Sequence, residues 1–157
     1  MIAIAEWHPI AVHFPLALVT TGAAALTAAR LFERRSATLA TLGTWNLCLG
    51  AVGALAALAT GLAAVASVEI GVAARAAVSL HIRWAMFSTA GLLLIAAWRG
   101  AGAAQDERPS RWFLGVLWAL VAALVVTGYR GGQNVYRYGV AVSRASVAAA
   151  PSTGVDP

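Results

Sequence analysis

The sequence predicts an all-α protein, a four-helix transmembrane bundle in up-down-up-down order with a short interfacial C-terminal segment. Of its 157 residues, 61% are hydrophobic and 11% are charged, whereas soluble domains average about 45–50% apolar and about 25% charged residues. Several long stretches carry no charge, the longest being residues 36–68. Since about 20 apolar residues suffice for a helix to cross a bilayer, each such stretch is a candidate span.

The charge-free stretches give four spans, at about residues 9–32, 37–67, 78–98 and 111–129. They form one domain over residues 1–145, and residues 146–157 are expected to be a disordered tail. Glycine, charge and proline together mark the connection at residues 100–110 as the clearest linker.

Prolines and glycines predict where the first and last helices begin, bend and end. Pro9 suits a first helical position, where its missing N–H costs nothing, and Pro15 is expected to bend the first turns. We expect Gly131 and Gly132 to end the fourth helix. The second span carries glycines that serve either close helix packing or the approach of a flat ligand; they are Gly43, Gly50, Gly53 and Gly61.

All eleven basic residues are arginines, and the formal net charge is +5. They stand singly or in pairs at the ends of apolar stretches, where membrane topology and lipid headgroups favour them, so we exclude nucleic-acid binding. Six flank the first and third connections and five belong to the opposite side. Because the two counts are nearly equal, they barely distinguish the two possible orientations in the membrane. The N-terminal segment carries no charge except Glu6, so we expect both termini outside.

An up-down bundle brings all three histidines to one face, because helix starts and ends alternate between its two faces. His8 and His13 precede or begin the first span, and His81 begins the third. His8 and His13 are separated by about 140° of helical rotation, so only one is expected to point inward. His13 lies deeper in the sequence and is the expected inward residue.

Two imidazoles from separate helices of a bundle favour a haem site. We expect His13 and His81 as axial ligands, Arg83 and Arg130 as partners of the propionates, and His8 nearer the water. Tyr136 belongs to the same candidate site. No Cys-x-x-Cys-His motif is present, so the haem would be bound non-covalently, as haem b.

Two other interpretations of the histidines stay open. One is a bare metal site built from the three imidazoles, with His13 and His81 among its ligands, although Glu6 and Glu69 are the only acidic residues near this face. The other is that the imidazoles hydrogen-bond to backbone carbonyls, including those freed around Pro9 and Pro15. No catalytic set such as Ser-His-Asp or paired carboxylates is apparent, so a stand-alone enzyme is not expected.

The opening His8-Pro9-Ile10-Ala11-Val12-His13-Phe14-Pro15-Leu16-Ala17-Leu18 resembles the start of DUF2231, a bacterial family of four-helix membrane proteins. The family also has a histidine early in the third helix, here His81. Its closing motif Gly-Gly-x-x-Val-Tyr-x-x-Gly-Val-x-Val matches residues 131–142. The resemblance covers residues 7–142. Two positions depart, since family members often have an apolar residue at Asn134 and a histidine at Tyr138.

Members of this family occur fused to Rieske-type iron–sulfur or cytochrome c modules, so the resemblance implies redox work at a membrane. We therefore expect electron transfer by haem b at the outer face of the bacterial inner membrane, with quinone as a candidate exchange partner. Expected partners are membrane lipid, other membrane or redox subunits, and further copies of the chain. The alternatives are a non-redox accessory subunit of a larger membrane complex and a histidine-based metal-binding protein.

Overall fold

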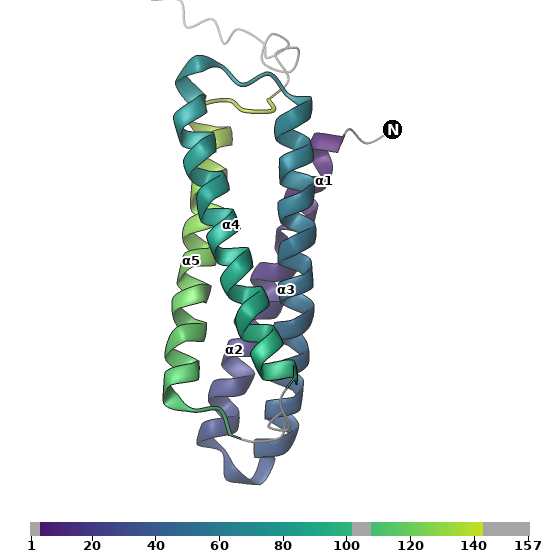
Figure 1. The fold of residues 1–157 in the computed structure, drawn as a ribbon, viewed down its shortest axis with the longest axis vertical. Coiled ribbons are helices and arrows are strands. Elements are labelled where there is room, and N and C mark those ends of the chain that lie inside the picture. Colours follow the sequence, from purple (N-terminus) through teal and green to yellow (C-terminus); the bar gives the residue numbers. More distant parts are fainter. Residues whose placement is uncertain (1–3, 102–107, 143–157) are drawn as a thin grey trace, which may run out of the picture.

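The computed structural model describes residues 4–101 and 108–142, and within these ranges it contains helices and no strand. The helices are α1 (Ile4–Ala11), α2 (His13–Leu31), the 3₁₀ helix η1 (Glu33–Arg35), α3 (Ser36–Ser67), α4 (Val72–Ala101) and α5 (Arg111–Tyr136). Four segments are long and apolar enough to cross a membrane: Glu6–Leu31, Glu33–Ser67, Val72–Ala101 and Arg111–Tyr136. The predicted four-helix transmembrane bundle is confirmed (Figure 1). The predicted tail at residues 146–157 lies outside the described residues.

The first span is interrupted at Val12, where α1 ends and α2 begins. Pro15 accounts for the break, because a proline ring lacks the N–H and clashes with the carbonyl four residues earlier, here that of Ala11. The helix itself begins at Ile4, so Pro9 lies inside α1. The expectation that Pro9 occupies a first helical position was wrong.

The double glycine does not end the last helix, contrary to the sequence-based expectation. Helix α5 continues through Gly131 and Gly132 to Tyr136. The chain reverses later, at Gly139, whose φ of 62° suits a residue without a side chain. The amide of Gly139 donates to the carbonyl of Val135, which closes the helix end. Two adjacent glycines only weaken a helix by about 1 kcal/mol each, and packing can offset that cost.

Helices α2 and α3 pack with their backbones in close approach. A β-carbon at Gly22 would lie 3.0 Å from the carbonyl oxygen of Gly43, and one at Gly50 would lie 2.6 Å from a methyl of Val19. For Gly43 and Gly50, close packing is therefore the role of the glycines. Leu26 and Leu47 are fully buried in this half of the bundle, where α4 and α5 add Leu92, Ile95 and Leu117 to the same core.

The bundle has two unlike ends. The arginine end carries η1 and the start of α5, and there Arg30 donates to the carbonyl of Pro109 at 3.0 Å while Arg108 pairs with Glu33 at 3.0 Å. Exposed tryptophans gather near this end, as expected for a membrane interface; they are Trp45, Trp98 and Trp112. The opposite end, here called the histidine end, carries α1, residues 68–71 and the end of α5 (Figure 1).

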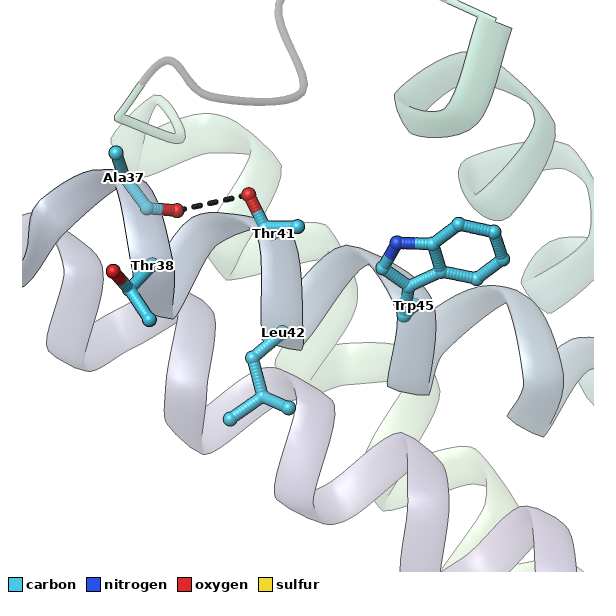
Figure 2. Close-up of a pocket in the computed structure, with 5 residues that line it drawn as sticks. All are labelled: Ala37, Thr38, Thr41, Leu42 and Trp45. Atoms are coloured by element: carbon cyan, nitrogen blue, oxygen red, sulfur yellow. Dashed lines mark hydrogen bonds between the residues drawn. The ribbon is translucent and has the colours of Figure 1, made fainter.

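A shallow surface groove near the arginine end runs along α3, over Ala37, Thr38, Thr41, Leu42 and Trp45 (Figure 2). The hydroxyl of Thr41 donates to the carbonyl of Ala37, 3.0 Å away in the same helix. All five residues belong to one helix and the threonine hydroxyl serves that helix, so we assign this groove no function.

The histidine end is packed more openly than the rest of the bundle. Helices α3 and α4 diverge towards it (Figure 1), and no residue of α3 beyond Ala57 is buried. Helix α1 packs against α3, but none of its Cα atoms comes within 8 Å of α4 or α5. Packed helices have axes about 8–10 Å apart, so the side chains of α1 face α4 across a wider interior.

Candidate histidine site

The imidazoles of His8 and His81 meet across this wider interior. Their ring centroids are 6.3 Å apart and their planes are inclined at 72°. His8 comes from α1 and His81 from α4, and both side chains are half-buried. The bundle topology therefore brings together two histidines that are far apart in sequence, as the sequence analysis expected for histidines of separate helices.

Each imidazole is oriented by a backbone carbonyl of the neighbouring helix. Nδ1 of His8 lies 2.9 Å from the carbonyl oxygen of Ala57 in α3, and Nδ1 of His81 lies 3.1 Å from that of Thr127 in α5. Because a carbonyl only accepts, Nδ1 carries the hydrogen in both rings. In the neutral ring the lone pair is then on Nε2. This is the arrangement in which metal-binding histidines are held by their surroundings.

A glycine stands beside each ring. A β-carbon at Gly61 would lie 2.9 Å from Cε1 of His8, and one at Gly131 would lie 3.1 Å from Cε1 of His81. Neither distance leaves room for a larger residue without displacement of the ring. Gly61 and Gly131 therefore make the space that the two imidazoles occupy, which explains why α5 tolerates a glycine inside its last turns.

His13 does not point into the bundle, and the expectation that it is the inward histidine was wrong. Its side chain is exposed, and Nδ1 donates to the carbonyl of Pro9 at 2.6 Å. That carbonyl lies just before the break at Val12, so the imidazole stabilises the interrupted helix. This is the hydrogen-bonding role that the sequence left open for a histidine between two prolines. The structure pairs His81 with His8 instead.

The other predicted site residues differ in position. Arg83 is exposed, in an open groove on α4 with Leu80, Trp84 and Phe87. Arg130 is half-buried, and its Nε is buried without a hydrogen-bond partner. Tyr136 is 91% exposed at the end of α5, which places its ring at the surface. Of these three, Arg130 has the most interior position, one residue before Gly131.

Three polar residues beside this site were not among those predicted from the sequence. Asn134 is 6% exposed, and its Oδ1 is buried without a hydrogen-bond partner. Thr127 supplies the carbonyl for His81, and its hydroxyl lies 3.1 Å from that of the fully buried Ser88. The helical spacing of Thr127, Arg130, Gly131 and Asn134 was the available signal, since residues three and four apart share a helix face.

The length of α3 puts the level of the histidine pair inside a bilayer that is centred on this helix. Helix α3 has 32 residues, which at about 1.5 Å per residue exceeds a hydrocarbon core of about 30 Å by roughly 18 Å. Ala57 is ten residues, or about 15 Å, from the end of α3 at Ser67. With the excess shared between both ends, the pair lies roughly 6 Å inside the hydrocarbon region. Polar groups at such depth usually mark function.

Comparison with known proteins connects the chain to a sequence family. The profile described as "Predicted membrane protein (DUF2231)" matches residues 6–144, which include both histidines of the pair and the α5 residues beside them. The description names a membrane protein and assigns it no activity. No curated protein and no solved structure matches the chain.

Proposed function

Because this chain belongs to the DUF2231 family of membrane proteins, we propose from its histidine site that it is a b-type haem protein. The haem would serve electron transfer at one face of the bacterial inner membrane. His8 and His81 are the proposed axial ligands, in place of the pair His13 and His81 that the sequence favoured.

The spacing of the two imidazoles is the observation that carries the proposal. A metal–imidazole bond is about 2.0 Å long and the ring nitrogen lies roughly 1.2 Å from the ring centre, so two imidazoles on opposite sides of one metal have centroids roughly 6–6.5 Å apart. The observed centroid distance is 6.3 Å. Both rings have Nδ1 engaged by a carbonyl, which leaves Nε2 as the ligand atom.

The composition of the site favours haem over a bare metal ion. In the described part of the chain, no group of three or more His, Cys, Asp or Glu side chains converges. Structural and catalytic metal ions usually need three or four protein ligands. Two imidazoles suffice for haem, because the macrocycle supplies the four equatorial nitrogens.

Helix spacing and charge around the pair also support the proposal. The interior between α1 and α4 is wider than in direct helix packing. Arg130 is the better candidate to bind a propionate, through the terminal nitrogens of its guanidinium, and Arg83 would hold the second only if its exposed side chain turned towards the site. When bound, haem would supply a one-electron couple, and His8 and His81 would hold it through their imidazoles.

The proposed cellular role follows from depth and topology. The pair lies near one membrane face, which we assign to the outside together with both termini. Quinone and a separate redox subunit are the proposed electron partners. In this proposal, membrane lipid covers the exposed apolar faces of the helices. Further copies of the chain are proposed to bind to the same faces.

The experiment is a reduced-minus-oxidised visible spectrum of purified protein expressed with haem supplied. We expect a low-spin b-type spectrum, lost in His8→Ala and in His81→Ala and kept in His13→Ala. Colourless protein, or full haem retention in both the His8 and His81 variants, would contradict the proposal and favour the alternative of a non-redox accessory subunit. In that case the two imidazoles only join helices through their hydrogen bonds to Ala57 and Thr127.

A further inference from the structure

Two buried polar atoms without hydrogen-bond partners lie one helical turn apart on α5. They are Nε of Arg130 and Oδ1 of Asn134. The side chain of Asn134 is 94% buried, since its exposure is 6%. A buried polar group that stays unpaired costs about 1–3 kcal/mol, so two such atoms on one face of α5 point to a group that the protein receives from outside.

The two atoms have opposite hydrogen-bonding needs. Nε of Arg130 is a donor and requires an acceptor, whereas Oδ1 of Asn134 is an acceptor and requires a donor. A carboxylate or phosphate only accepts, so it satisfies Arg130 and leaves Asn134 unpaired. A hydroxyl group accepts one hydrogen bond and donates another, so it offers what each of the two atoms requires.

The position of the two atoms restricts the molecule that carries the hydroxyl. Residues 130 and 134 lie on the face of α5 that holds Gly131 against the ring of His81. They are at the open histidine end, close to the hydrocarbon region of the membrane. A molecule that reaches them from the membrane is lipid-soluble and presents its hydroxyl at the interface.

We infer that Arg130 and Asn134 bind a hydroxyl of a membrane quinol head group beside the histidine pair. This inference rests on the proposed function, because a quinol is the lipid-soluble hydroxyl compound that exchanges electrons with a membrane haem. It adds a defined subsite and a preference for one oxidation state. The oxidised quinone has no O–H group, so it can accept from Arg130 but cannot donate to Asn134.

The test measures binding of decylubiquinol and of decylubiquinone to the purified protein in lipid nanodiscs, without oxygen, with empty nanodiscs as reference. Loss of one hydrogen bond worth about 1.4 kcal/mol weakens binding tenfold. We therefore expect the wild type to bind quinol about tenfold more tightly than quinone. Asn134→Leu should remove this preference, and Val135→Leu, a change on the exposed neighbouring residue, should retain it.

A second variant keeps the test decisive if Asn134→Leu does not fold. Arg130→Lys retains the charge and removes the Nε–H, and it should weaken binding of both forms. Equal binding of quinol and quinone by the wild type, or an unchanged preference in the Asn134 variant, would overturn the inference. So would the absence of saturable binding, which would leave a bridging water as the partner of both atoms.

The haem spectrum of the same samples separates the inference from the proposed function. Quinol preference in protein without haem would uphold the subsite and contradict the haem assignment. A normal haem spectrum without quinol preference would support the haem assignment and contradict the quinol subsite.

Discussion

Gly131 lies against the imidazole of His81, so closely that a β-carbon at residue 131 would stand 3.1 Å from Cε1. Its neighbour Gly132 is different, because a β-carbon there would meet only the ring of Tyr136 at 3.9 Å, an ordinary contact. The adjacent glycines therefore have different roles, and the pair offers a matched experiment within one helical turn.

Gly131→Ala should displace the ring of His81 and destabilise the bundle by about 1–3 kcal/mol, as overpacking does. Gly132→Ala should be neutral or stabilise by about 0.4–1 kcal/mol, since alanine reduces the entropy of the unfolded chain. Thermal unfolding in detergent measures both. Equal behaviour of the two variants would contradict a specific role for Gly131, and under the proposed function only Gly131→Ala should also lose haem.

The corresponding position on α3 is Gly61, beside the ring of His8. Gly61→Ala should move this ring, because a β-carbon would stand 2.9 Å from Cε1, and should weaken its hydrogen bond to Ala57. Gly115→Ala is the control, since nothing lies within 4 Å of a β-carbon there. We expect a loss of about 1–3 kcal/mol for the first variant and none for the second, measured by denaturant unfolding. A Gly61 variant as stable as the control would show that the imidazole of His8 can move aside without a loss in the free energy of unfolding.

His13 should contribute to helix stability and not to the paired site. His13→Phe removes the hydrogen bond to Pro9 and should lower stability by about 0.5–1.5 kcal/mol. His13→Asn retains an N–H donor and should recover part of that loss. Thermal unfolding gives the stabilities, and the nuclear magnetic resonance signals of the other two imidazoles give the state of the pair. Altered signals of His8 and His81 in both variants would show that His13 also affects the paired site, contrary to this prediction.

The two bundle ends should lie on opposite sides of the membrane. In a Cys48→Ser background, single cysteines at Arg34 and Arg137 place one thiol at each end, and both positions are exposed. An impermeant thiol reagent applied to intact cells should label residue 137 and not residue 34. Labelling of residue 34 alone would reverse the proposed orientation, and equal labelling of both would contradict four spans.

Several features of the site were accessible from sequence because they depend on local chemistry. The apolar stretches predicted the helices, since hydrocarbon forces the backbone to satisfy its own hydrogen bonds. Pro15 predicted a bend, and the chain breaks at Val12. The alternation of helix directions predicted that His81 meets a histidine of the first span. None of these inferences needed a distance between residues far apart in sequence.

Other features depended on helix rotation and packing, which the sequence left open. His8 and His13 differ by about 140° around a regular helix, so only one of them can point inward, and the sequence left open which one. The role of Gly131 was misread as a helix stop because glycine favours helix ends, whereas contact with His81 decides it. In the sequence, Asn134 is only a position that departs from the family motif, and its burial is known from the structure alone.

The sequence by itself determined the class of protein, the number of spans and the end of the bundle at which the histidines gather. These follow from hydrophobic length and chain direction, which are properties of each segment alone. Only the tertiary structure decided which two imidazoles meet, which carbonyls orient them and which polar atoms lie buried without partners beside them. Those relationships depend on how far apart α1, α4 and α5 stand and on how each is rotated, and such geometry arises only when the helices pack.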